Sequence, residues 1–436
     1  MNPKSLIKRV IRVNLKRLGC LLACLMTAAS GTAAAEIAAA VTGRAREDVQ
    51  TVRRYAAQLR EQNRMEDYAH GEFTWDTERR QTSWGYPNGF MLDAMLRLDR
   101  EESIPLAEAF FRDNILEDGS VRDYADGSVD SVQPARALQR LIPDSAEAER
   151  YRAAIQWIYS RLENQRKYPA CGNNYLHVQN ENGRPAAGVL KYPIFLDGLY
   201  MTQPFLARCA ADIRGGQLTL TDREGAAVSA EDLEAEILRR YTWVQAYLYD
   251  GDLELYQHAW DVSGGKGNGH YWGRGIGWLA ISMADVIEIL PEGPGRERIK
   301  GILVQLLDGM LIWQDDVSGM WYNVVNRGED LLENRTETSV TAMMAYALMK
   351  AWNGGYAPGD HYLEKGMEAF HAVIRDKAEI RDGEIHIRDT YLKSGVGDTD
   401  EYYCREGYTT DEAKGTAALI MAAAEIAKAI GAYAGE

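Results

Sequence analysis

Apolar residues recur along most of the chain at the spacing of an amphipathic helix, and few stretches alternate in the manner of a strand. The pattern predicts an all-α protein. The twelve expected helices span residues 45–63, 87–98, 103–113, 131–142, 145–164, 195–212, 230–247, 274–290, 294–312, 337–352, 360–376 and 412–431.

Every second predicted helix is more apolar than its neighbours. Residues 342–348 read Ala-Met-Met-Ala-Tyr-Ala-Leu, whereas the helix at 145–164 carries charged side chains such as Glu149 and Arg152. A helix that is apolar nearly all round is buried, and one with a charged face lies outside it. The alternation therefore predicts six inner and six outer helices in a closed toroid, an (α/α)6 barrel.

The composition agrees with a single large core. The chain has 436 residues, of which 46% are hydrophobic and 26% charged. These are ordinary proportions for a globular protein. No stretch rich in Ser, Pro or Gly interrupts the apolar pattern after residue 44. We therefore expect one catalytic or binding domain over residues 36–436.

The first 35 residues differ from the rest of the chain. They hold six basic residues and no acidic one, then an apolar run at 18–29, then Ala33, Ala34 and Ala35. This order is typical of a signal peptide cleaved after a small residue. The apolar run is short for a bilayer, so we expect export to the periplasm or beyond, without stable membrane insertion. A lipid anchor on Cys24 and a retained amphipathic helix are the less favoured alternatives.

Charge and cysteine usage exclude several classes of function. Loss of the six cations of the signal would change the net charge from −15 to −21. Such an acidic surface disfavours nucleic acids and anionic membranes as partners. Cys171, Cys209 and Cys404 would remain, at spacings that fit no metal motif or disulfide framework. Cys209 lies on an apolar helical face, and a bridge between Cys171 and Cys404 stays open. We expect a monomer without metal or cofactor.

The residues with chemical potential gather before alternate helices. In an alternating barrel the inner helices all begin at one mouth, where helix N-termini also favour anions. The sequence thus predicts a binding site at that mouth. Its candidate residues are Tyr86, Asp130, Asp197, His258, Trp260, Arg274, Trp278 and Glu337.

Two carboxylates are the candidate catalysts. Asp197 follows Phe195 and Leu196, and apolar surroundings raise the pKa of a carboxyl and make it a proton donor. Asp130 would supply the second carboxylate that glycosidic chemistry commonly needs. For both residues the alternative is an ordinary acid at a helix start, which for Asp130 would be a cap.

Arg274 lies between Trp272 and Trp278 in a segment with three glycines. A guanidinium in such a setting can hold a carboxylate by two hydrogen bonds, and tryptophan faces suit sugar rings. The alternative is a tight contact between helices. For His258 the alternative is a loop histidine, and for Glu337 it is an ordinary first-turn acid.

Six segments occur in the order found in glycoside hydrolase family 105, which the chain resembles over nearly all of residues 45–431. That family comprises unsaturated rhamnogalacturonyl hydrolases and is related to the unsaturated glucuronyl hydrolases of family 88. The segments are Trp84–Gly89, Val129–Pro134, Leu196–Met201, His258–Asp261, Trp272–Trp278 and Glu337–Ser339.

The resemblance implies an (α/α)6 barrel and a reaction at a 4,5-unsaturated uronyl residue. Asp197 matches the general acid/base, which protonates C4 of the vinyl ether and activates a water that adds at C5. Asp130 matches the second essential acid. His258, Arg274 and Trp278 match substrate-binding positions, and Tyr86 matches an aromatic residue at the sugar.

The chain departs from the family pattern at one place. The family commonly carries a His shortly before the catalytic segment, whereas residues 187–193 here contain none. His177 lies further back, and its equivalence stays open, as does the aglycone sugar. Alternative interpretations are an unsaturated glucuronyl hydrolase for ulvan-, gellan- or glycosaminoglycan-derived fragments, a conventional inverting glycosidase, and a non-catalytic exported sugar-binding toroid.

Overall fold

Twelve α-helices occupy the part of the chain that the computed structural model describes, residues 31–62 and 83–434. Each coincides with one of the twelve predicted helices, so the all-α class is confirmed. The inner helices are α3 (Tyr86–Leu98), α5 (Ala135–Leu141), α7 (Asp197–Arg214), α9 (Gly273–Ile289), α11 (Thr338–Asn353) and α13 (Ala413–Ala434). The outer helices are α2 (Gly31–Gln62), α4 (Arg100–Asn114), α6 (Ala148–Asn164), α8 (Ala230–Leu248), α10 (Pro294–Ile312) and α12 (His361–Lys377).

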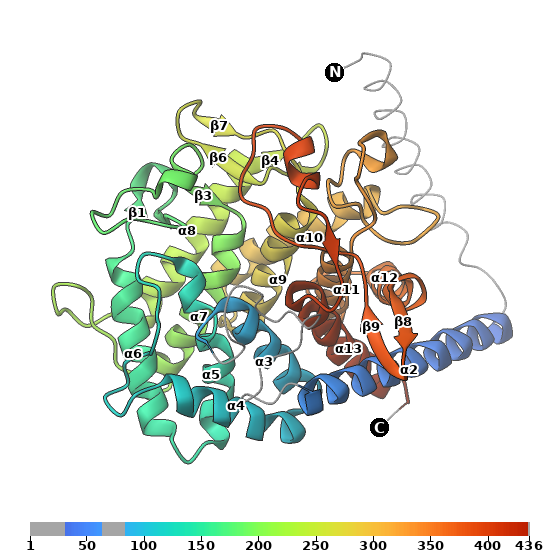
Figure 1. The fold of residues 1–436 in the computed structure, drawn as a ribbon, viewed down its shortest axis with the longest axis horizontal. Coiled ribbons are helices and arrows are strands. Elements are labelled where there is room, and N and C mark those ends of the chain that lie inside the picture. The colour runs from blue at the N-terminus through green and yellow to red at the C-terminus, as the bar shows by residue number, and fades with distance from the viewer. Residues whose placement is uncertain (1–30, 63–82, 435–436) are drawn as a thin grey trace.

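The inner helices form a closed ring. Each packs against the next in the order α3, α5, α7, α9, α11, α13, and α13 packs back against α3. Each outer helix packs on an inner one, as α4 does on α3 and α8 does on α7 (Figure 1). The predicted (α/α)6 toroid is therefore confirmed. The alternation of apolar character has its cause here, since every residue of α11 from Thr338 to Ala351 is buried.

Short strands lie in the loops between the helices and were not predicted. They are β1 (Lys167–Tyr168), β2 (Asn174–Tyr175), β3 (Ile194–Phe195), β4 (Tyr249–Asp250), β5 (Leu255–Tyr256), β6 (Ala259–Asp261), β7 (Lys266–Gly267), β8 (Ala378–Arg381), β9 (Glu384–Ile387), β10 (Thr390–Tyr391) and β11 (Tyr408–Thr409). At two to four residues, such strands are too short to show an alternating pattern. β3, β6 and β7 form an antiparallel sheet at one end of the molecule, at the top of Figure 1.

Three predicted helix starts are wrong. The first helix begins at Gly31, 14 positions before the expected start at residue 45. The helix expected at 131–142 is divided into a 3-10 turn, η1 (Val129–Val132), and α5. Pro134 lies at the division, where its ring removes one backbone donor. The helix expected from residue 195 begins at Asp197, because residues 194 and 195 pair with Trp260 and Ala259 in the sheet. The last two differences leave Asp130 and Asp197 at the entrance of the barrel.

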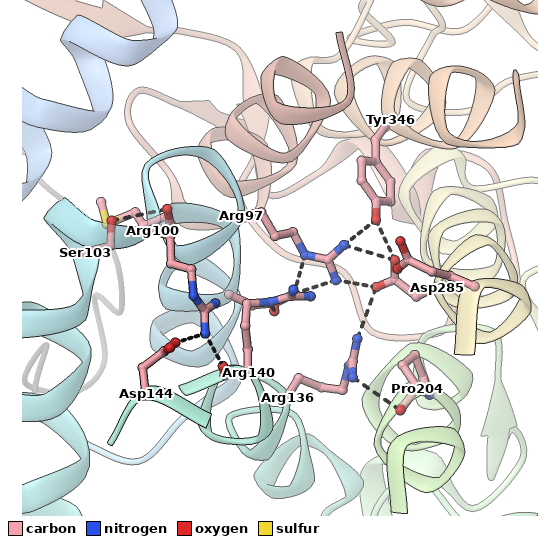
Figure 2. A network of polar contacts seen from close by, with 12 residues as sticks. Arg97, Arg100, Ser103, Arg136, Arg140, Asp144, Pro204, Asp285 and Tyr346 are labelled. Atoms are coloured by element: carbon pink, nitrogen blue, oxygen red, sulfur yellow. Dashed lines mark hydrogen bonds and ion pairs between the residues drawn. The ribbon is translucent and has the colours of Figure 1, made fainter. Parts of the chain in front are cut away.

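A buried network of charges joins the inner helices below this entrance (Figure 2). Asp285 of α9 accepts hydrogen bonds from Arg97 of α3 at 2.7 Å and from Tyr346 of α11 at 2.5 Å. Arg136 of α5 lies 3.5 Å from the same carboxylate and donates to the carbonyl of Pro204 on α7. Five of the six inner helices thus meet around one carboxylate. Its pKa is lowered well below the usual value, because these cations outweigh the effect of burial.

The three cysteines of the described residues are free and buried. The bridge between Cys171 and Cys404 that the sequence left open is therefore absent from this structure. Within residues 31–62 and 83–434, none of the helices has the length and apolarity needed to cross a bilayer. Most of the predicted signal segment, residues 1–30, lies outside the described residues, and residues 31–35 belong to α2.

Candidate active site

Asp197 is the first residue of α7, and the sheet brings His258 against it. β3 pairs with β6, and the backbone N–H of Leu196 donates to the carbonyl of His258 at 3.0 Å. His258 Nε2 lies 2.9 Å from Asp197 Oδ2, and Nδ1 lies 2.9 Å from Tyr403 Oη. Asp197 is therefore one end of a buried carboxylate–imidazole–phenol chain rather than an isolated acid at a helix start.

The contacts of Tyr403 fix the tautomer of His258. Its phenolic oxygen accepts hydrogen bonds from the backbone N–H of Gly397 and from the side-chain amide of Asn268. Its own hydrogen is then left to donate to Nδ1 of His258. The hydrogen on Nε2 consequently points at Asp197, so the imidazole donates to the carboxylate.

The predicted rise in the pKa of Asp197 is wrong. Burial does act to raise it, and this is the largest single effect. The hydrogen bond from His258 and the electrostatic influence of His258, His177 and Arg274 together outweigh burial and lower the pKa below its usual value. The apolar neighbours in the sequence account for the effect of burial, but these three side chains come from distant segments of the chain.

Asp130 faces the same entrance and is paired with a second imidazole. Its Oδ1 lies 3.0 Å from His177 Nε2. Its own backbone N–H is capped by the hydroxyl of Ser128 at 3.3 Å. The helix cap is thus supplied by Ser128, and the carboxylate of Asp130 is directed into the site. This geometry disfavours the alternative that Asp130 is an ordinary cap.

Tyr86 lies among the charged groups of the site. Burial raises the pKa of its hydroxyl well above the usual value, and the negative charges of Asp130, Glu412 and Asp197 raise it further. Arg274 acts in the opposite direction. The charges of Asp130, Asp197 and Arg274 thus all act on the Tyr86 hydroxyl, and the role of these residues at a sugar stays a prediction.

Arg274 contacts residues of β10 and of the N-terminal end of α11. Its Nη1 donates to the carbonyl of Tyr391 at 2.5 Å and lies 3.9 Å from Glu337 Oε1. Its guanidinium also stacks over the ring of Trp272, 4.7 Å from the centroid. Glu337 is fully buried and accepts from the backbone N–H groups of Val340 and Tyr391 at 2.8 Å. Glu337 is both a helix cap and a support for Arg274, and does not line the entrance.

Two predicted substrate-binding residues pack against other aromatic rings. Trp278 is 1% exposed and stacks on Tyr200 at 4.8 Å, with the edge of Tyr86 at 6.5 Å. It supports the Tyr86 ring, and its contact with a sugar stays a prediction. Trp260 packs edge-on against Trp243 and Tyr247 of the outer helix α8, so the structure does not bring it to the Asp197 group.

The sequence left other residues of the site unassigned, chiefly His177, Tyr403 and the pair Glu412 and Lys414. Lys414 donates to Glu412 in the first turn of α13 and lies 5.9 Å from the Tyr86 ring centroid. Tyr403, Glu412 and Lys414 belong to residues 402–415, which resemble the closing segment of the family, but no role could be assigned to them from the sequence. Only the closed ring places them near Asp197 and Tyr86. Among the described residues, no group of three His, Cys, Asp or Glu is arranged to hold a metal ion.

Comparisons with known proteins agree with this geometry. The chain is 29% identical to Protein Atu3128 of Agrobacterium fabrum over 222 residues, which is 46% of this chain and 94% of that protein. It is 32% identical to the unsaturated rhamnogalacturonyl hydrolase YesR of Bacillus subtilis over 131 residues, 30% of this chain and 37% of YesR.

The structure also resembles that of a family 105 glycoside hydrolase from C. acetobutylicum, with a TM-score of 0.69 and 25% identity, over 80% of this chain and 96% of that one. The resemblance stated from the sequence motifs is thus confirmed. The model of Glycosyl Hydrolase Family 88 matches residues 56–430. That match spans most of the chain, which accordingly belongs to Glycosyl Hydrolase Family 88.

Proposed function

We propose that the chain removes a 4,5-unsaturated uronyl residue from the non-reducing end of lyase-generated oligosaccharides of the rhamnogalacturonan type. One observation carries the proposal: Asp197 and Asp130 each contact an imidazole, at 2.9 Å and 3.0 Å, and the positive charge of Arg274 acts on the Asp197 carboxyl. Family membership and the match to YesR, a rhamnogalacturonyl hydrolase by name, support this choice of substrate.

In the proposed reaction Asp197 gives a proton to C4 of the vinyl ether. The carboxylate that remains activates a water, which adds at C5. The resulting hemiketal opens and releases the aglycone together with a 4-deoxy-5-keto-uronic acid. Arg274 binds the uronyl carboxylate, Tyr86 contacts the sugar ring, and Asp130 orients it. His258 and Tyr403 hold the Asp197 carboxyl in place through the 2.9 Å contacts.

Because the pKa of Asp197 is low, its carboxylate must be protonated before it can act as the acid. In the free protein His258, His177 and Arg274 together favour the carboxylate form. A uronate bound at Arg274 places a negative charge beside the site and neutralises that cation, which raises the pKa of a neighbouring carboxyl. We infer that substrate binding promotes protonation of Asp197, so turnover falls as pH rises through the pKa of the complex.

The segment before residue 36 supports a second proposal, export. A secreted enzyme would meet oligosaccharides longer than imported disaccharides. Expression of the full chain followed by cell fractionation tests this, with N-terminal sequencing of the product. Mature protein outside the cytoplasm that begins at residue 36 is expected. Full-length protein in the cytosol contradicts it.

The test of function follows the vinyl-ether absorbance of unsaturated oligosaccharides during incubation with purified protein. The panel contains rhamnogalacturonan, ulvan and glycosaminoglycan fragments made by lyases. Loss of absorbance with the rhamnogalacturonan fragment is expected, and preference for either of the other two would instead identify a glucuronyl hydrolase. Asp197→Asn keeps the shape of the side chain and should lower kcat by at least about 10²-fold. An unchanged signal across the whole panel overturns the proposal.

A further inference from the structure

His177 lies 20 positions before Asp197, further back than the histidine that the family commonly carries, and directly against Asp130. We propose that His177 is the positioning residue for Asp130: it fixes the orientation in which this carboxylate meets the sugar. The inference deepens the proposed function and rests on it. His177 Nε2 lies 3.0 Å from Asp130 Oδ1, and the imidazole is 7% exposed whereas the carboxylate side chain is 33% exposed.

That difference in exposure is the reason a positioning residue is needed. A carboxylate that is one-third exposed at a wide entrance can rotate toward solvent, where water satisfies it equally well. The Ser128 hydroxyl holds only the backbone of Asp130. The contact with His177 therefore selects one rotamer of the Asp130 side chain. Ser128 contacts the backbone of Asp130, whereas His177 contacts its carboxylate.

Neighbouring residues hold the backbone and one ring face of His177, while its Nδ1 is buried without a hydrogen-bond partner among the described residues. Its backbone N–H donates to the carbonyl of Pro193 at 2.9 Å, and its carbonyl accepts from Val129 at 3.1 Å. Its ring stacks on Phe195 with centroids 3.8 Å apart. A Cβ at Gly198 would lie 3.2 Å from His177 Nδ1, so glycine leaves the room that the ring occupies. The imidazole is thus a rigid element between the two acids.

The charged groups around His177 are consistent with this role. Asp130 contacts it from η1, and His177 also acts electrostatically on Asp197 at the start of α7. The other side chains that lower the pKa of Asp197 are His258 and Arg274. Each acid therefore has its own imidazole, and the two imidazoles come from different segments of the chain. Removal of His177 leaves the Asp197–His258 contact intact.

Two substitutions of His177 distinguish the effect of its hydrogen bond to Asp130 from the effect of the volume that its ring fills. In His177→Gln the amide nitrogen can take the place of Nε2 and still donate to Asp130. In His177→Asn the shorter side chain reaches only the place of Nδ1 and cannot. We expect His177→Asn to lower kcat/KM on the order of 10²-fold, because a displaced catalytic group costs about that much. His177→Gln should remain within about tenfold of the wild type.

A double-mutant cycle with Asp130→Asn tests whether His177 acts through Asp130. In that background His177→Asn should lower kcat/KM far less than it does in the wild type, and the loss that remains reports the electrostatic influence of His177 on Asp197. If Asp130→Asn abolishes turnover, the affinity for intact unsaturated oligosaccharide, measured by calorimetry, supplies the cycle instead. Circular dichroism of each variant checks the fold.

If the wild type turns over the substrate, three outcomes would contradict the proposal. They are wild-type activity in His177→Asn, equal losses in the Gln and Asn variants, and losses that multiply in the double mutant. If the wild type turns over none of the oligosaccharides, the proposed function itself fails. That result differs from failure of the His177 proposal, in which the wild type is active and only the variants behave differently from expectation. Rescue by Gln together with a non-additive cycle supports the proposal.

Discussion

Replacement of Asp285 by Asn should destabilise the protein strongly. The Asp285 side chain is 1% exposed, and its carboxylate lies 2.7 Å from Arg97, 3.2 Å from Lys350 and 3.5 Å from Arg136. Asn keeps the shape but removes the negative charge, so these cations lose a partner in the interior. The removal of one partner from a buried ion pair costs about 3–5 kcal/mol of unfolding free energy.

The ion pair between Arg100 and Asp144 supplies a matched control (Figure 2). Its side chains are 37% and 39% exposed. Exposed pairs contribute about 0–1 kcal/mol, so Asp144→Asn should be nearly neutral. Urea unfolding followed by tryptophan fluorescence compares the two variants with the wild type. If Asp285→Asn lost no more than Asp144→Asn, the network would not be what stabilises the ring.

Folded Asp285→Asn should retain the catalytic activity of the wild type. Arg274 and Asp285 lie 11 positions apart on α9, which corresponds to about 16 Å of helix. We therefore expect kcat below the unfolding temperature to stay within about twofold of the wild type, because distant sites act almost independently. A large loss of kcat in fully folded Asp285→Asn would mean that the network also shapes the active site.

Three further predictions concern the site and the pH dependence of stability. Arg274→Lys should raise KM about tenfold or more with a smaller change in kcat, since a lysine cannot make the bidentate contact with a carboxylate; steady-state kinetics that show an unchanged KM would remove Arg274 from the binding of the uronate. Tyr403→Phe should lower kcat about fivefold, because one hydrogen bond that fixes the His258 tautomer contributes on the order of 1 kcal/mol; full activity would show that the tautomer is fixed without it. Burial raises the pKa of Asp93 and Asp285, but nearby arginines, with Lys350 at Asp285, lower each below its unfolded value. Their contribution to stability is therefore complete above about pH 4 and is lost as the pH falls further. The urea midpoint of the wild type should drop over that acid range more steeply than that of Asp285→Asn, and equal slopes would contradict this assignment.

The sequence predicted the fold well because helical periodicity is a local property. All twelve helices and their inner and outer roles follow from spacing and apolar content, and the ring closes as expected. The short strands escaped prediction, although the pairing of β3 with β6 is what brings His258 to Asp197. Two or three residues of extended chain carry no pattern, so their pairing is decided by the tertiary structure.

Some features of the candidate site could likewise be predicted from the sequence and others could not. Asp130, Asp197, Tyr86 and Arg274 could be found because they stand beside helix starts, and His258 because it begins one of the segments that resemble the family. The direction in which the pKa of Asp197 shifts could not, because it depends on His177, 20 positions earlier, and on Arg274, 77 positions later. Apolar sequence neighbours describe the burial of a carboxylate but not its charged partners.

The most direct test of the central claim is the site at which the proton is delivered. Purified protein is incubated with an unsaturated rhamnogalacturonan fragment in D2O, and the first product is followed by NMR. Proton transfer from Asp197 to C4 predicts one deuterium at C4, a keto group at C5 and loss of the vinyl ether. Release of an unsaturated uronate that keeps its double bond and carries no deuterium would show cleavage at the glycosidic oxygen, and would contradict the account.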